Sequence, residues 1–231
     1  LTARALGVEL LVHYGHSCLV PMDPKAGMKV LYVFVDIKID PLHFIETIKL
    51  NFKTDVRIGL VSTIQFITTL QAVSKELEVA GYKVTIPQFK PLSPGEILGC
   101  TAPVLTCADA VIYLGDGRFH LEAAMIANPK LQAFRYDPYD KKFTKEYYEH
   151  EQMQTIRHEI ISQAKMADKF GIIMGTLGRQ GSFKVVDHLR IRLNDVGKET
   201  VVILLSEIFP SKLDLFSFLD SFVQIACPRL S

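Results

Sequence analysis

Cysteine is the residue type whose positions in this sequence most directly suggest chemistry. The chain holds four, Cys18, Cys100, Cys107 and Cys227. They form no C-x-x-C pair, which gives no support to a zinc ribbon or a thioredoxin-like redox site. Four buried thiols in a reduced, cytoplasmic protein are one interpretation. The alternative is a site that distant cysteines assemble in space, and an internal repeat would indicate such a site.

Two segments that each occur twice suggest a repeat. Residues 57–63 (RIGLVST) resemble residues 171–177 (GIIMGTL), and each copy precedes a helix, a strand and then a cysteine. Residues 11–17 (LVHYGHS) resemble residues 111–117 (VIYLGDG) in the same way. This pattern predicts βα units that each contribute one quasi-equivalent cysteine.

The spacing of one unit predicts a third cysteine. Gly115 lies 15 residues after Cys100, and the same offset counted back from Gly15 falls just before Leu1. We therefore expect a third equivalent cysteine within a few residues upstream of Leu1. Together with Cys100 and Cys227 it would converge on a pseudo-threefold centre.

Three converging thiolates suit two kinds of metal site. They can hold three irons of a [4Fe–4S] cluster and leave the fourth iron open for a substrate ligand. They can also bind zinc and leave one position open for a nucleophile. Parallel sheets gather ligands beyond the carboxyl ends of their strands, so we expect the cysteines there. The residues alone do not choose between iron and zinc.

Three glycine-rich turns follow apolar stretches and are expected at the same strand ends. They are residues 13–18 (HYGHSC), 115–120 (GDGRFH) and 175–182 (GTLGRQGS). Glycine lets the backbone approach a ligand closely, and Arg118 and Arg179 can bind a carboxylate through two parallel hydrogen bonds. No turn matches a dinucleotide fingerprint or a Walker loop. Tight structural turns with solvated arginines are the alternative interpretation.

The elements that must position these turns alternate between short apolar strands and longer helices, which predicts an α/β fold. The strands carry Val, Ile and Leu without polar alternation, as in parallel sheets covered on both faces. Strands are expected at residues 10–14, 30–35, 57–61, 83–86, 110–114, 171–174, 201–205 and 222–225. Helices are expected at residues 64–80, about 144–169, and 182–196.

Repeat and element order together predict three homologous parallel-sheet α/β domains around a pseudo-threefold centre. Residues 1–41 would form the back half of domain 1, residues 42–165 a complete domain 2, and residues 166–231 the front half of domain 3. The long polar helix 144–169 is expected to connect two units rather than enter a core. Because no methionine begins the sequence, we expect it to be a fragment of a longer chain.

Composition excludes several classes of protein. With 26 Lys+Arg against 25 Asp+Glu the formal net charge is +1, which argues against a protein that coats DNA or an anionic membrane. Apolar residues make up 48% of the chain, but no apolar run approaches the roughly 20 residues that span a bilayer. We therefore expect buried strands and no membrane insertion.

Six longer motifs carry a family resemblance. They are residues 11–21 (LVHYGHSCLVP), 93–103 (SPGEILGCTAP), 113–129 (YLGDGRFHLEAAMIANP), 175–182 (GTLGRQGS), 206–213 (SEIFPSKL) and 224–231 (QIACPRLS). With these motifs essentially the whole chain resembles the diphthamide biosynthesis proteins that form 2-(3-amino-3-carboxypropyl)histidine synthase. The stretch 206–213 is similar to the eukaryotic type of the first subunit.

The resemblance implies three α/β domains that each give one cysteine to a [4Fe–4S] cluster. Cys100 and Cys227 match the second and third ligands, and the first is expected upstream of Leu1 in a Tyr-Gly-Ala-Cys stretch. Cys18 and Cys107 match no ligand position, and we interpret them as structural thiols. The implied reaction is the first step of diphthamide biosynthesis, a radical transfer of the 3-amino-3-carboxypropyl group of S-adenosylmethionine to C2 of a histidine of translation elongation factor 2.

The three turns are also where we expect S-adenosylmethionine to bind. The glycine-rich backbone and Arg179 would hold its aminocarboxypropyl group, and His16, Asp116 and Glu207 would orient the polar ends. The full set of predicted contacts is His16, Ser17, Asp116, Gly117, Arg118, Gly178, Arg179, Gln180, Gly181 and Glu207.

The resemblance further implies partner proteins, and two other functions stay open as alternatives. It implies a cytoplasmic heterodimer with diphthamide biosynthesis protein 2, a small electron-donor protein, and elongation factor 2 as protein substrate. A non-catalytic scaffold that binds elongation factor 2 or the partner subunit is an alternative from another class, in which the glycine turns are only structural. A zinc hydrolase is a third interpretation.

Overall fold

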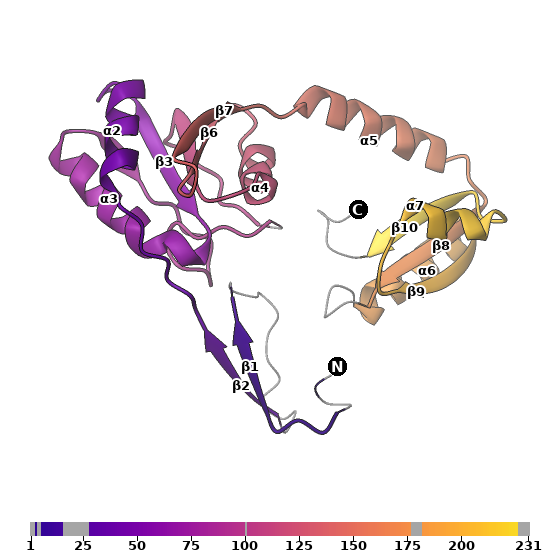
Figure 1. Cartoon of the computed structure of the whole chain (residues 1–231). Helices are drawn as coiled ribbons and strands as arrows, with labels where there is room; N and C mark the ends of the chain where they lie inside the picture. The colour runs from indigo at the N-terminus through magenta and orange to yellow at the C-terminus, as the bar shows by residue number, and fades with distance from the viewer. Residues whose placement is uncertain (1–2, 4–5, 16–27, 100, 177–181, 226–231) are drawn as a thin grey trace. The chain divides into compact units, whose positions relative to one another are not determined.

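The computed structural model of the chain describes residues 3, 6–15, 28–99, 101–176 and 182–225 (Figure 1). They form two compact units, 1–148 and 149–231. The strands form three sheets in which every neighbouring pair is parallel except one, so the predicted α/β class is confirmed. Within the described residues no helix is long and apolar enough to cross a membrane.

The largest sheet, in the first unit, has five strands in the order β4-β3-β5-β6-β7. The bounds are β3 Arg57–Ser62, β4 Lys83–Thr85, β5 Ala110–Leu114, β6 Gln132–Asp137 and β7 Lys142–Glu146. β3 and β5 are the central pair, and apart from Arg57 all their residues are buried. Burial on both faces explains why these strands show no polar alternation.

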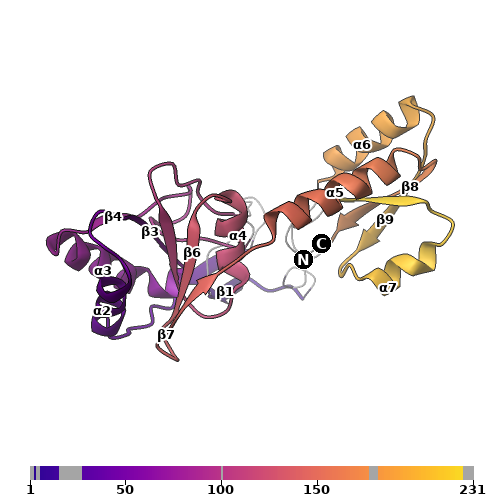
Figure 2. The ribbon, with the colours of Figure 1, turned by 90° about the horizontal axis from the view of Figure 1, so that it is seen from above.

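Helices cover both faces of this sheet, as Figure 2 shows from above. They are α2 Leu42–Asn51, α3 Ile67–Val79 with the short η2 Ile64–Phe66 before it, and α4 Phe119–Ala127. α2 and α3 pack on the face that carries Leu60 and Ile112. α4 packs on the opposite face, against Val61 and Val111.

The first unit also holds a two-stranded parallel sheet of β1 Leu10–Tyr14 and β2 Lys29–Val33. The turn that leaves β1 hydrogen-bonds to the end of β2, because the N–H of Gly15 donates to the carbonyl of Val33 at 3.3 Å. After β5 the N–H of Gly115 donates in the same way to the carbonyl of Tyr136 in β6, at 3.0 Å. Residues 11–15 and 111–115 therefore share a local structure, whereas residues 16 and 17 of the predicted resemblance lie outside the described residues.

The second unit is built on three parallel strands in the order β10-β8-β9. Its elements are α5 His150–Ala164, β8 Lys169–Gly175, α6 Phe183–Asp195, β9 Glu199–Leu205, α7 Pro210–Leu213, η3 Asp214–Phe216 and β10 Ser221–Ile225. α5 buries no side chain. The three sheets fall one into each of the expected ranges 1–41, 42–165 and 166–231, whose boundaries stay a prediction.

The expected helix 144–169 is wrong at its N-terminal end. Residues up to Glu146 belong to β7, which pairs antiparallel with β6, and α5 begins only at His150. β6, β7, α2 and α4 were not predicted at all. β7 is an edge strand of mostly polar residues (KFTKE), so its composition carries little strand signal.

In each unit one aspartate joins the N-terminal ends of two neighbouring strands of the sheet. Asp109 precedes β5, and its carboxylate accepts the N–H of Arg57, the first residue of β3, at 3.0 Å. Asp220 precedes β10, and its carboxylate accepts the N–H of Lys169, the first residue of β8, at 2.8 Å. β10 is therefore the equivalent of β5, and β8 the equivalent of β3.

We expect Arg57→Ala to raise the pKa of Asp109. The guanidinium of Arg57 donates to both Asp109 oxygens at 3.0 and 2.6 Å, which lowers the pKa of that carboxyl from 3.8 to about 2. Without it the pKa should return part of the way, since the main-chain bond remains. Because the folded-state pKa is depressed, any stabilisation by this pair is present above about pH 4 and is lost as the pH falls toward 2. Carboxyl NMR titration measures the shift, and Arg157→Ala on the exposed face of α5 is the matched control.

Candidate functional site

The candidate site lies at the carboxyl edge of the five-stranded sheet. The short β4 pairs only with the first half of β3, and the segment 95–97 pairs with the last residue of β3. The N–H of Ser62 donates to the carbonyl of Gly95 at 2.8 Å, and the N–H of Ile97 donates to the carbonyl of Ser62 at 2.9 Å. This pairing buries Glu96, which is 1% exposed. Its Oε2 accepts the N–H of Ser93 at 3.1 Å, and its Oε1 has no hydrogen-bond partner among the described residues.

The residues on either side of Cys100 lie at the same edge, while Cys100 itself is outside the described residues. Leu98 and Thr101 exchange two main-chain hydrogen bonds, at 3.2 and 3.3 Å. A Cβ added to Gly99 would overlap the ring of Phe119, the first residue of α4. The turn that contains position 100 is therefore packed directly against the start of α4, next to the turn that follows β5.

The side chain of Tyr113 packs against the turn after β5 and hydrogen-bonds to it. The hydroxyl of this buried tyrosine donates to the carbonyl of Asp116 at 3.4 Å, and a Cβ added to Gly115 would lie 2.5 Å from it. Burial raises the pKa of Tyr113 well above its usual value. Gly117 has a φ of +64°, a conformation that favours glycine. The backbone of the turn is thus fixed in a shape that few other sequences can adopt.

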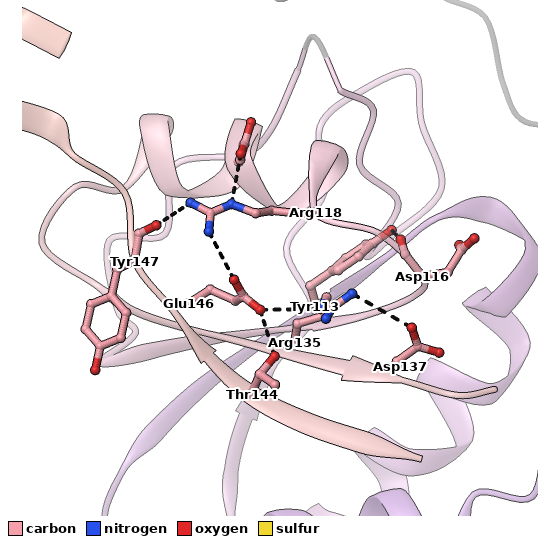
Figure 3. Close-up of polar contacts among 9 residues, drawn as sticks. Tyr113, Asp116, Arg118, Arg135, Asp137, Thr144, Glu146 and Tyr147 are labelled. Atoms are coloured by element: carbon pink, nitrogen blue, oxygen red, sulfur yellow. Dashed lines mark hydrogen bonds and ion pairs between the residues drawn. The ribbon is translucent and has the colours of Figure 1, made fainter. Parts of the chain in front are cut away.

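Arg118 ends the turn in a cluster of ion pairs, drawn in Figure 3. Its Nε donates to Glu122 at 2.9 Å, its Nη1 to Glu146 at 3.3 Å, and its Nη2 to the carbonyl of Tyr147. The other oxygen of Glu146 lies 3.4 Å from the Nε of Arg135. All three nitrogens of Arg118 are therefore bound within the protein, which anchors the turn to β7. A contact of Arg118 with S-adenosylmethionine stays a prediction.

The other predicted contacts fall into two groups. Asp116 and Glu207 are both exposed; Glu207 lies 3.4 Å from the Nζ of Lys212, whereas no ion pair or hydrogen bond engages the carboxylate of Asp116 within the described residues. The remaining predicted residues, together with Cys18, lie outside the described residues: His16, Ser17, Gly178, Arg179, Gln180, Gly181, Cys100 and Cys227.

Cys107 does not have the burial expected of a structural thiol. It is exposed, because it lies in the turn before β5, and its Sγ approaches Thr106 Oγ1 at 3.8 Å. Among the described residues no group of three His, Cys, Asp or Glu side chains is placed to hold a metal ion.

The strand order corrects the predicted pattern of a helix, a strand and then a cysteine, which holds for Cys100 and is wrong for Cys227. The role of both cysteines as ligands stays a prediction. Only β4 separates α3 from Cys100, whereas β9 and β10 both separate α6 from Cys227. Asp116 follows Asp109 by seven residues, and Cys227 follows Asp220 by the same seven. Cys227 is thus the counterpart of Asp116. A repeat search could not find this because it matched motifs without knowing how many strands lie between them.

Counting residues back from the same two aspartates gives Cys100 a different counterpart, Ser211. Nine residues separate Cys100 from Asp109, and nine separate Ser211 from Asp220. Glu96 and Glu207 correspond in the same way, and an isoleucine follows each of them. By these offsets Cys100 and Ser211 form one pair of equivalent sequence positions, and Asp116 and Cys227 form another. The recurring Glu-Ile pair was the signal that could have revealed Glu96 from the sequence.

A cavity of about 250 Å³ opens near the carboxyl ends of β1, β2 and β3. It is lined by Gly15, Val35, Ile37, Ile64 and Gln65. The N–H of Ile37 donates to the carbonyl of Gln65 at 2.8 Å and joins the chain after β2 to η2.

The chain is similar to known proteins over its whole length. The sequence model of diphthamide synthesis proteins matches residues 1–231. Subunit 1 of 2-(3-amino-3-carboxypropyl)histidine synthase from Nematostella vectensis is 62% identical over 230 residues, covering 100% of this chain and 49% of that protein. The human protein of the same name is 58% identical over 232 residues, covering 100% and 53%. The chain thus spans about half the length of these curated relatives.

Solved structures show the same fold. The crystal structure of Dph2 from Pyrococcus horikoshii matches with a TM-score of 0.76 at 26% identity, over 99% of this chain and 66% of that one. A second crystal structure of the same protein, with a 4Fe-4S cluster, matches equally, over 99% and 67%. The likeness extends over both compact units.

Proposed function

The chain belongs to the diphthamide synthesis protein family, and from this premise we propose that it carries the iron–sulfur site of a 2-(3-amino-3-carboxypropyl)histidine synthase. The full-length match to the family, with relatives of that name at 58% and 62% identity, is the observation that carries the proposal. In the proposed reaction S-adenosylmethionine donates its 3-amino-3-carboxypropyl group to C2 of a histidine of elongation factor 2. The first step of diphthamide biosynthesis would then take place in the cytoplasm.

The residues at the carboxyl edges fit a [4Fe–4S] cluster. Cys100 and Cys227 would hold two irons, and a third cysteine upstream of Leu1 would hold another. The flanks of Cys100 are tightly packed, as Gly99 shows, and the buried hydroxyl of Thr101 has no hydrogen-bond partner among the described residues. Such a hydroxyl can donate to a cluster sulfur. The homologous Dph2 with a 4Fe-4S cluster supports iron over zinc.

The cofactor and the protein would divide the work. A reduced cluster would supply the electron that breaks the bond between the sulfur of S-adenosylmethionine and its γ-carbon. The residues of this chain hold the reactants: Arg179 would bind the carboxylate, and the main chain of the glycine turns would lie close beside it. The ion pairs of Arg118 and the hydroxyl of Tyr113 keep the turn after β5 rigid, so a reactant placed against it has little freedom.

The partners belong to the same proposal. Relatives named as a first subunit support a multi-subunit enzyme, and we propose diphthamide biosynthesis protein 2 as the other half of a heterodimer. A small electron-donor protein would reduce the cluster, and elongation factor 2 would present the histidine.

We expect Cys100→Ala and Cys227→Ala to abolish both the cluster and the transfer. Each change removes one thiolate from a three-cysteine site, so iron and sulfide content should fall to background in the full-length protein reconstituted without oxygen. Cys107→Ala is the matched control, because this exposed cysteine matches no ligand position of the family. Iron, sulfide and zinc analysis, with transfer of labelled aminocarboxypropyl group to elongation factor 2, measures the result.

The same experiment separates the alternatives. Full transfer by both variants in complex with the partner subunit would refute these two cysteines as cluster ligands and leave a scaffold that binds elongation factor 2 as the function of this chain. Stoichiometric zinc in place of iron in the wild-type protein would point to a zinc hydrolase instead.

A further inference from the structure

We propose that the strand β9 pairs with β9 of a second copy of this chain, antiparallel to it, so that two sheets join into one. The surface that carries this contact is the outer edge of the three-stranded sheet in the second unit (Figure 1). The inference goes beyond the proposed function, which names a different subunit as partner and assigns no surface to it. It depends neither on the cluster nor on the transfer reaction.

The first reason is the row of main-chain groups that β9 leaves unpaired. At the two ends of β9, the N–H of Glu199 and the carbonyl of Leu205 bond to the residues that flank β8, each at 2.8 Å. The hydrogen bonds of a strand in a parallel sheet alternate between its two sides, so the odd-numbered residues of β9 face β8. The even-numbered residues turn their N–H and carbonyl groups to the other side, where no described strand pairs with them. These residues are Thr200, Val202 and Leu204.

The second reason is that the sequence of β9 does not protect this edge. Natural proteins cover their outer strands or make them short, charged or rich in proline, because an exposed edge pairs with other chains. β9 runs for seven residues (ETVVILL), and its single charge is at its first residue, Glu199. Val201, Val202 and Leu204 are 40%, 39% and 52% exposed. A long apolar edge of this kind is suited to pairing with another strand.

The equivalence of the two units favours another molecule as the occupant of this edge. β9 lies beside β8 as β4 lies beside β3, and β4 is the outermost strand of the five-stranded sheet. There the further strands, β6 and β7, lie on the side of β5. Strands that correspond to β6 and β7 would therefore lie beside β10, at the opposite end of the three-stranded sheet. β4 itself has only three residues and presents a much shorter edge.

The register of β9 on itself selects a second copy as that molecule. When two antiparallel copies share a twofold axis at Val202, this residue faces its own copy, and Thr200 faces Leu204. These are the outward-facing residues, so each pair can exchange two hydrogen bonds, and every outward-facing main-chain group of both strands finds a partner. Glu199 falls opposite Leu205, which keeps the two carboxylates at opposite ends of the paired strands, where they do not repel each other.

Disulfide crosslinking of the full-length protein, kept anaerobic with oxidised glutathione, tests the axis and the register. Directly opposite residues of antiparallel strands have Cβ atoms about 4.5–5.5 Å apart, within reach of a disulfide after a small shift. We therefore expect Val202→Cys to form a dimer linked through residue 202, identified by mass spectrometry. Val201→Cys is the matched control, since Val201 is equally exposed but its two copies would lie diagonally, at about 7–8 Å. It should crosslink no more than the wild type.

Sedimentation equilibrium of the full-length protein measures the strength of the contact. The wild type should dimerise reversibly, and Val202→Lys should weaken dimerisation at least about tenfold, because two lysines would face each other across the axis. Leu50→Lys is the matched control: this leucine is 85% exposed near the end of α2 in the first unit, and its change should leave the dimer intact.

Three results would overturn the inference. They are a wild-type protein that stays monomeric at high concentration, equal crosslinking through residues 201 and 202, and a dimer that Val202→Lys leaves unchanged. Protection of β9 from hydrogen exchange only after the other subunit is added would also overturn it, because that subunit would then be the occupant. Each of these results leaves the proposed transfer reaction untouched.

Discussion

Gly99→Ala in the full-length protein is expected to weaken iron binding about tenfold, as changes beside a metal ligand commonly do. The added Cβ would overlap the ring of Phe119, so either the ring or the turn before α4 must move. The ring is 44% exposed and can swing outward, which spares the fold. The ligand is disturbed by the overlap itself, because as long as the ring is present the backbone of Gly99, next to Cys100, is pushed away from it. Iron and sulfide content after anaerobic reconstitution measures the effect.

A double variant separates this contact from a general loss of stability. Phe119→Ala removes the ring, so Gly99→Ala should recover most of its iron in that background, while Phe119→Ala alone should retain near wild-type iron. Non-additivity of this kind identifies residues that act through direct contact. Wild-type iron content in Gly99→Ala would show that the packing of the turn is irrelevant to the metal. Equal loss with and without the ring would show that the backbone of position 99, not the contact, is responsible.

The central strands could be predicted from sequence because burial on both faces leaves an unbroken apolar pattern. β5 has the expected bounds, 110–114, and β3 differs from its prediction only by including Ser62. Two of the missed helices are shorter than the predicted ones: α2 has 10 residues and α4 has 9, whereas α3 and α6 have 13 each. α4 follows Arg118 with no capping hydrogen bond, and α2 follows Pro41, although the carboxylate of Asp40 accepts the N–H of Leu42 at 3.0 Å. That aspartate was a usable signal.

In the candidate site, too, local features could be predicted from the sequence and long-range contacts could not. The turns could be predicted because each follows an apolar strand, and strand ends are local features of a sequence. The anchoring of Arg118 could not, because Glu146 reaches it only through the hairpin of β6 and β7. The fact that Cys100 precedes β5 whereas Cys227 follows β10 also depends on strand order, which is a property of the sheet and not of any motif.

Asn128 connects the loop after the cysteine turn to the end of α4, and its loss should be costly. The side chain is 6% exposed. Its Oδ1 accepts the N–H of Leu105 at 2.7 Å, and its Nδ2 donates to the carbonyls of Pro103 and Ala124, each at 2.9 Å. Ala124 keeps a main-chain donor in any variant, but Leu105 and Pro103 depend on this amide within the described residues. The Asn128 side chain thus satisfies two main-chain groups of the buried loop 103–105, the carbonyl of Pro103 and the N–H of Leu105.

Asn128→Leu should therefore destabilise this region by about 2–5 kcal/mol, since two polar main-chain groups stay buried without a partner, at about 1–3 kcal/mol each. The apolar side chain has a similar volume, so packing alone does not account for the loss. Hydrogen exchange of the peptide that contains Leu105, in the full-length protein, measures the local free energy of opening. Asn51→Leu is the matched control: its amide also bonds a main-chain carbonyl, that of Thr47 at 2.8 Å, but at an exposed helix end, where the cost should stay near 0.5 kcal/mol. Equal protection of Leu105 in the wild type and Asn128→Leu would mean that water replaces the amide, and that the loop is not held by Asn128.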